Sequence, residues 1–225
     1  VKGHGPLDNR PRAAPRQVAQ ERAILGAEAL DIGGVRWAKH VQHSSGIRFV
    51  LIQPGDFVMG SSVETDHAPA PRTITIRHGF YMSENEVSAA EYAAVMKLPP
   101  PLADDGRMPK AGLSWADADS FCKGDIQLPT EAEWEYACRA GTSTAYSFGA
   151  TLGSQQGATA ENGFRPQPCG FSERNAFGLA DMHGNVKEYC RDKYLEPAEY
   201  GRLSPVDPLG TKGKQRVLRG GSFAS

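Results

Sequence analysis

The segment NAFGLADMHGNVKEY at residues 175–189 constrains the fold of this chain more than any other. It places Asp181 and Glu188 on either side of a Gly184-Asn185 pair, with apolar residues alternating around them. Such a pattern predicts a tight turn between short extended segments, because Gly and Asn tolerate positive φ at little steric cost. Two carboxylates and several main-chain carbonyls would then converge, which suits calcium and its roughly six to eight oxygen ligands. The alternative is a pair of solvated surface acids around a turn.

The overall composition excludes several classes of partner. The chain has 225 residues, enough for one domain of about 170 residues and an arm. Its 25 Lys and Arg against 26 Asp and Glu give a formal charge of -1, so we expect no nucleic-acid partner. No run of about 18 apolar residues is present, so we expect a soluble chain without membrane insertion. The compartment and the oligomeric state do not follow from the sequence.

The cysteines and histidines form no catalytic or metal-binding motif. Cys122, Cys138, Cys169 and Cys190 include no CxxC pair, and we expect buried free thiols. A Cys169–Cys190 disulfide is the alternative. The six histidines form no HxxxH or HExxH pair. His183 lies beside the acid pair, where it is more typical of a hydrogen-bonding residue than of a general base.

Three short helices are predicted from their capping residues. Ser88 with Glu91 and Thr130 with Glu133 have the spacing of capping boxes, and Ser114 can cap a third helix. The predicted helices therefore cover residues 88–96, 114–122 and 130–140.

The other elements are predicted from periodicity and breakers. Helix-forming composition predicts a helix over residues 18–30, within an N-terminal arm at residues 1–44. Two apolar runs broken by Pro-Gly-Asp predict a hairpin over residues 47–59. Alternation predicts a strand at residues 72–78 and a short strand at residues 216–218, and residues 141–175 have no periodicity.

Several segments, taken in order, resemble the sulfatase-modifying-factor or formylglycine-generating-enzyme family. LPTEAEWEYACRAG and NAFGLADMHGNVKEY carry the most specific similarity. The others are FVLIQPGDFVMGS, GFYMSENEVSAAEYAAVM, LSWADADSFC and RVLRGGSF. The resemblance implies an α+β fold of the C-type-lectin-like type over residues 45–225, with short twisted strands, few helices and much irregular loop.

The resemblance also implies a structural calcium site. The family's ligands correspond to the side chains of Asp181 and Glu188 and the main-chain carbonyls of Gly184 and Val186. A second family calcium site would use residues 158–163, where the acidic and Asn residues match poorly.

Two functions follow from the resemblance. Variable proteins of diversity-generating retroelements carry RVLRGGS-like sequence before a ligand-binding segment. The first function that the resemblance implies is therefore a non-catalytic module, which binds a protein or peptide through Arg219, Ser222 and Phe223. The alternative is a copper-dependent, formylglycine-generating oxidase acting on a sulfatase-type cysteine. The reactive cysteines of that enzyme follow the Gly-Gly-Ser segment, and none of the four cysteines of this sequence matches them. We therefore assign no catalytic residue and expect the domain to lack the family's C-terminal segment.

Overall fold

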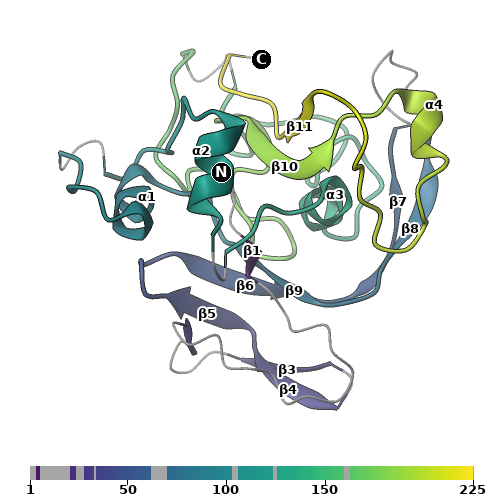
Figure 1. Ribbon diagram of the computed structural model, residues 1–225, viewed down its shortest axis with the longest axis horizontal. Helices are drawn as coiled ribbons and strands as arrows, with labels where there is room; N and C mark the ends of the chain where they lie inside the picture. The colour runs from purple at the N-terminus through teal and green to yellow at the C-terminus, as the bar shows by residue number, and fades with distance from the viewer. Residues whose placement is uncertain are drawn as a thin grey trace.

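The structure is a computed structural model that describes residues 4–5, 21–23, 28–32, 34–61, 70–102, 106–123, 126–159 and 163–224. A five-stranded antiparallel sheet of order β1-β9-β6-β5-β2 lies beside three two-stranded sheets, β3-β4, β7-β8 and β10-β11 (Figure 1). Its strands are β1 (His4–Gly5), β2 (Glu21–Ala23), β5 (His40–His43), β6 (Arg48–Ile52) and β9 (Phe80–Ser83). The other strands are β3 (Ala29–Ile32), β4 (Val35–Ala38), β7 (Gly55–Met59), β8 (Arg72–Ile76), β10 (Glu188–Lys193) and β11 (Arg216–Arg219).

Strand β6 connects two hydrophobic clusters. Successive side chains of a strand point to opposite faces of the sheet. Accordingly Val50 and Ile52 pack in the cluster that contains Trp134, whereas Phe49 and Leu51 pack in the cluster that contains Phe121. This sheet is therefore buried on both faces at its centre, which explains the nearly continuous apolar run of β6.

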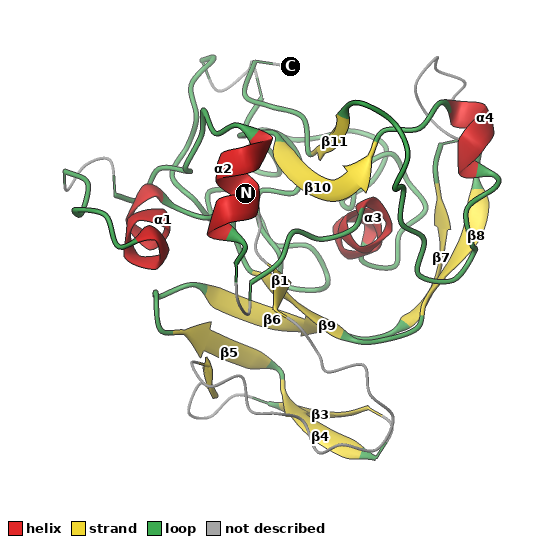
Figure 2. Cartoon of the chain, in the orientation of Figure 1, coloured by secondary structure: helices red, strands yellow, loops and turns green. Residues whose placement is uncertain are grey.

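The three helices predicted from capping residues are confirmed. They are α1 (Ala89–Met96), α2 (Trp115–Phe121) and α3 (Glu131–Arg139), and each begins with a capping box in which both hydrogen bonds are present. A fourth short helix, α4 (Pro197–Tyr200), precedes the loop that leads to β11 (Figure 2). Among these helices and the rest of the described residues, none is long and apolar enough to cross a membrane.

The helix predicted over residues 18–30 is wrong where the structure describes that segment. Residues 21–23 form β2, which pairs with β5, and residues 29–32 form β3, which pairs with β4. Helix propensity is a weak tendency that pairing with a neighbouring strand readily overrides. Most of residues 1–20 lie outside the described residues, although His4–Gly5 pair with β9. The division of the chain at residue 44 remains a prediction.

The hairpin predicted over residues 47–59 is also wrong. Its two apolar runs are strands β6 and β7, but β6 pairs with β5 and β9, whereas β7 pairs with β8. Both edges of β6 are thus occupied, and Pro54 has no N–H to offer a partner strand. The Pro-Gly turn therefore carries the chain from one sheet to another. The predicted strands at residues 72–78 and 216–218 are confirmed as β8 and β11.

Candidate functional site

The turn at Gly184 and Asn185 forms as the sequence predicted. Asp181, Gly184 and Asn185 have φ values of 58°, 90° and 57°. A Cβ on Gly184 would lie 2.1 Å from the carbonyl oxygen of Ala158, so this position requires glycine. A strand follows the turn, where β10 begins at Glu188, but none precedes it in the described segment 163–187.

The carboxylates of the predicted calcium site are buried and make hydrogen bonds to the protein. The two oxygens of Asp181 accept from the N–H groups of Gly170, at 2.5 Å, and Ser172, at 3.0 Å. Glu188 Oε2 accepts from the indole Nε1 of Trp134 at 2.7 Å. Both acids therefore brace loops around the turn, and neither is the solvated surface acid of the alternative interpretation.

Glu86 is a third acid at this turn, and the sequence analysis missed it. Its Oε1 accepts from the N–H of Val186 at 3.0 Å, and its Oε2 accepts from the side-chain amide of Asn185 at 2.5 Å. Burial raises the pKa of Glu86 well above its usual range, and the negative charges of Glu188 and Asp181 raise it further. Its partners lie 99 and 100 positions further along the chain, so no local sequence pattern signalled it.

We call Glu86, Asp181, Glu188 and the Gly184-Asn185 turn the acid corner. In the described part of the chain, no group of three Asp, Glu, His or Cys side chains could hold a metal ion. Calcium would therefore depend on main-chain carbonyls as well as carboxylates, as the sequence predicted. The oxygen donors are of the kind that a hard cation takes, and its charge would offset the burial and the neighbouring negative charges that disfavour ionised Glu86.

The acid corner is bonded directly to the Gly-Gly-Ser segment that follows β11. The N–H of Gly184 donates to the carbonyl of Gly220 at 2.7 Å, and the N–H of Phe223 donates to the carbonyl of Asn185 at 2.8 Å. Any ion that stiffens the turn would therefore stiffen residues 220–223 as well.

Arg219 joins β11 to α3. Its Nη2 lies 2.6 Å from Glu135 Oε2, its Nη1 lies 3.6 Å from Glu131 Oε1, and its Cζ lies 5.2 Å from the ring centroid of Trp134. Arg139 also pairs with Glu135, at 2.8 Å. The guanidinium that the sequence analysis assigned to ligand binding is thus engaged by two buried acids.

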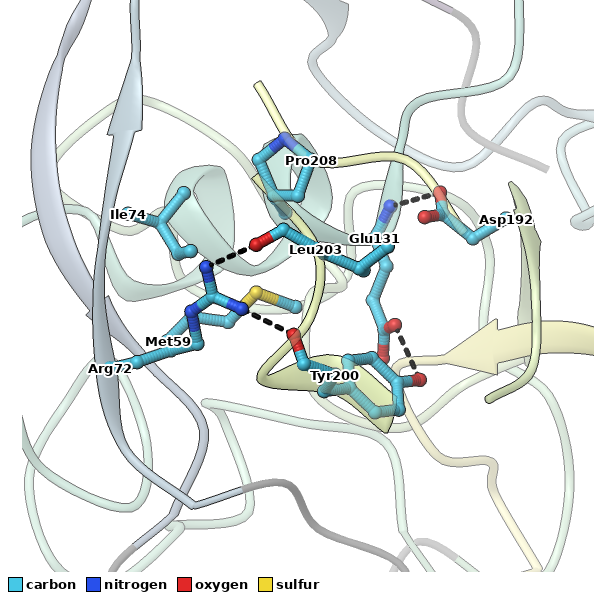
Figure 3. Close-up of a pocket in the computed structure, with 9 residues that line it drawn as sticks. Met59, Arg72, Ile74, Glu131, Asp192, Tyr200, Leu203 and Pro208 are labelled. Atoms are coloured by element: carbon cyan, nitrogen blue, oxygen red, sulfur yellow. Dashed lines mark hydrogen bonds between the residues drawn. The ribbon is translucent and has the colours of Figure 1, made fainter. Parts of the chain in front are cut away.

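Glu131 also belongs to a closed cluster of side chains, which holds the segment after α4 in place (Figure 3). The Tyr200 hydroxyl donates to Glu131 Oε2 at 2.9 Å, and Asp192 Oδ2 accepts from the N–H of Glu131 at 2.8 Å. Arg72 reaches from β8 to the carbonyls of Tyr200 and Leu203 (Figure 3). Burial raises the pKa of both Glu131 and Asp192. The cavity among these residues is only about 10 Å³, so the cluster is structural.

A large open hollow lies along β11 and shares Glu131 and Tyr200 with this cluster. This hollow, which we call the β11 groove, has a volume of about 800 Å³. Its lining includes all four residues of β11, two of the three acids and the arginine of α3, and several aromatic side chains, namely Trp115, Tyr189, Tyr194 and Tyr200.

A smaller hollow of about 280 Å³, the Phe223 pocket, adjoins the groove. Ser222 and Phe223 line it, and Tyr189 and Leu218 line both hollows. Leu218 is 46% exposed, which is unusual for a large apolar side chain at the middle of a strand. The residues that the sequence predicted for ligand binding therefore line two adjoining hollows, with Arg219 in the groove and the other two in the pocket.

The structure gives the remaining candidates structural roles. His183 Nε2 accepts from the N–H of Ser147 at 3.1 Å, and the ring packs edge-on against Tyr146. His183 is thus a hydrogen-bonding residue, as the sequence analysis expected.

All four cysteines are free thiols, so the alternative Cys169–Cys190 disulfide is not formed. Burial raises the pKa of Cys122 to about 12 and also raises the pKa of Cys169 and Cys190. These three thiols are therefore poorly suited to nucleophilic chemistry at neutral pH.

Comparison with known proteins agrees with this fold. The family model described as "Sulfatase-modifying factor enzyme 1-like domain" matches residues 37–225. The chain is 39% identical over 224 residues to a formylglycine-generating enzyme of Streptomyces coelicolor, covering 92% of this chain and 66% of that protein. It is 28% identical over 212 residues to the serine/threonine-protein kinase pkn1 of Chlamydia pneumoniae, covering 78% of this chain and 33% of that protein. The chain thus spans less than two thirds of the length of either relative.

Two solved structures resemble the molecule closely in shape. PvdO from Pseudomonas aeruginosa superposes with a TM-score of 0.68 at 22% identity, over 80% of this chain and 83% of that one. Treponema denticola variable protein 1 superposes with a TM-score of 0.67 at 21% identity, over 88% of each chain. The predicted α+β, C-type-lectin-like fold is confirmed.

Proposed function

Because this chain belongs to the family of sulfatase-modifying factor enzyme 1-like domains, we propose that it is a non-catalytic module whose β11 face binds a protein or peptide ligand. The observation that carries the proposal is the continuity of the β11 groove and the Phe223 pocket, which share Tyr189 and Leu218. Together they form an extended, partly apolar face, a shape suited to a chain-like ligand. The similarity in fold to a Treponema denticola variable protein supports a role of the kind found in diversity-generating retroelement variable proteins.

Calcium is the proposed structural cofactor of this module. Its ligands would be the carboxylates of Asp181 and Glu188 and the carbonyls of Gly184 and Val186, with Glu86 as a further carboxylate beside the turn. The bound ion would supply positive charge to a buried acidic site. The two main-chain bonds from the turn to residues 220 and 223 support the idea that the acid corner keeps the β11 face rigid.

Selection from a phage-displayed library of random peptides tests the binding function. We expect the wild-type chain to enrich peptides and Phe223→Ala to lose that enrichment, because the change removes a wall of the Phe223 pocket. Phe164→Ala is the matched control, since Phe164 is 64% exposed and lines neither hollow. Equal loss in both variants, or no enrichment by the wild-type chain, would refute the proposal.

A formylglycine-generating oxidase is the second candidate function, and the 39% identity to a formylglycine-generating enzyme favours it. Copper prefers soft thiolate ligands, and burial holds three of the four thiols in the protonated form. The chain loaded with Cu(I) is mixed with a sulfatase-type peptide that contains cysteine, and the product mass is measured. Conversion of the cysteine to an aldehyde would overturn the non-catalytic proposal.

A further inference from the structure

We propose that the ligand of the β11 face is an acidic peptide and that Arg216 is its anchor. This inference rests on the proposed binding function and adds the chemistry of the ligand. It follows from the geometry of one arginine, from the distribution of charge over the two hollows, and from the free edge of β11.

Arg216 is held in place before any ligand arrives. Its Cζ lies 3.6 Å from the ring centroid of Trp115, and its Nη1 donates to the carbonyl of Arg191 at 2.8 Å. The side chain lines the β11 groove. A guanidinium has five N–H donors in a rigid plane, so one bond to a carbonyl leaves donors for a carboxylate. Because stacking already fixes the side chain, binding would cost little conformational entropy.

The acids that line the groove are already paired with other residues and do not neutralise Arg216. Glu135 pairs with Arg139 and Arg219, and Glu131 accepts from Tyr200 and lies 3.6 Å from Arg219. The two acids and two arginines therefore balance in formal charge, which leaves Arg216 as the excess charge among the described residues that line the groove.

The Phe223 pocket extends the positive surface. Lys110 and Lys187 line it, and the described residues of that lining include no acid. Lys187 is exposed, whereas Lys110 lies 5.4 Å from the ring centroid of Tyr92. A face with three excess cations, on a chain of formal charge -1, is complementary to an acidic ligand.

The edge of β11 favours an extended peptide. Within the described residues β11 pairs with β10 on one side and with no strand on the other. Its outer edge can therefore offer main-chain donors and acceptors to an added strand, while the adjoining hollows take alternate side chains. A nucleic acid is also an anion, but the chain as a whole lacks the positive charge that such a partner needs.

Fluorescence anisotropy with labelled peptides of about ten residues tests the inference. The probes alternate Ser with Glu, with Gln or with Lys, and a labelled single-stranded oligonucleotide is a fourth probe. We expect the Glu peptide to bind the wild-type chain about tenfold more tightly than the Gln peptide, as for one charge-assisted contact. Arg216→Gln should remove that preference. Arg36→Gln is the control, because it removes the same charge from an exposed side chain that lines neither hollow.

A second pair of variants tests the same inference in case Arg216→Gln does not fold. Lys187→Gln should weaken binding of the Glu peptide, and Lys212→Gln, an exposed lysine outside both hollows, should not. Equal binding of the Glu and Gln peptides would overturn the acidic ligand but leave the proposed binding face intact. Tighter binding of the oligonucleotide than of the Glu peptide would also overturn it. Failure of every peptide to bind would refute the binding function itself.

Discussion

Replacing Arg219 by Met would test whether this residue holds β11 against α3. The guanidinium lies 2.6 Å from one carboxylate and 3.6 Å from another, and the side chains of Glu135 and Glu131 are only 6% and 8% exposed. Methionine keeps an unbranched apolar chain but carries no charge. The substitution therefore leaves two buried acids without their shared cation.

The magnitude follows from the contacts that remain. Removing one partner of a buried ion pair costs about 3–5 kcal/mol. Glu135 keeps Arg139 at 2.8 Å, and Glu131 keeps the hydroxyl of Tyr200 at 2.9 Å. We therefore expect the lower end, a loss of about 3 kcal/mol in the free energy of unfolding. For a domain of this size, that loss corresponds to a melting temperature lower by about 6–12 °C.

The loss should depend on pH. Burial raises the pKa of Glu131 above 4.5, and the charge of Arg219 partly offsets that rise. Without Arg219 the pKa of Glu131 in the folded state rises further. An acid with a raised folded-state pKa is stabilising below its unfolded pKa, and that contribution is lost as pH rises through the folded pKa. The difference in the free energy of unfolding between wild type and variant, which we call the gap, should thus be larger at pH 8 than at pH 5.

Urea unfolding of both proteins at the two pH values measures this gap. Arg191→Met serves as the control for loss of a positive charge, because Arg191 is exposed. A loss below about 1 kcal/mol, the range of an exposed pair, would refute the argument that Arg219 neutralises buried acids. A gap of equal size at both pH values would refute the role assigned to the charge of Glu131.

Three further predictions concern the acid corner and the core. Gly184→Ala should destabilise the fold by more than about 2 kcal/mol in urea unfolding, whereas Gly178→Ala, with a φ of 86° and open space around it, should cost only about 1 kcal/mol of backbone strain. Equal losses would contradict the close approach of Ala158. Asn175→Ala should lower the free energy of unfolding by about 2–4 kcal/mol, because the Asn175 amide donates to two carbonyls of α3 and its side-chain carbonyl accepts from two N–H groups. Asn175→Asp should keep only the two accepted bonds. An Ala variant as stable as the wild type would contradict this prediction. A thiol titration of the denatured, unreduced chain should find all four cysteines reactive, and a count of two would indicate a disulfide.

The sequence predicted those elements whose chemistry is local. Each capping box depends on two residues three positions apart, so Ser88 and Thr130 were sufficient to locate the starts of α1 and α3. The positive φ at Gly184 and Asn185 likewise belongs to the turn itself. The acids at Asp181 and Glu188 were therefore correctly placed beside a turn.

The errors and omissions concern partners that lie far along the chain. Sheet pairing decided that residues 21–23 are a strand and that β6 and β7 do not form a hairpin. Glu86 meets Val186 across 100 positions, a separation that no local pattern records. The ion pairs of Arg219 with α3 likewise join residues far apart along the chain, whereas its predicted contact with a ligand stays a prediction.

The most direct test of the account is thermal unfolding with added calcium or with a chelator. We expect calcium to raise the melting temperature of the wild-type chain and the Asp181→Asn, Glu188→Gln double variant to lose that increase. A Glu173→Gln, Glu196→Gln double variant removes two exposed acids and should keep it. A wild-type melting temperature that is the same with calcium and with chelator would contradict the proposal that the acid corner holds a structural ion.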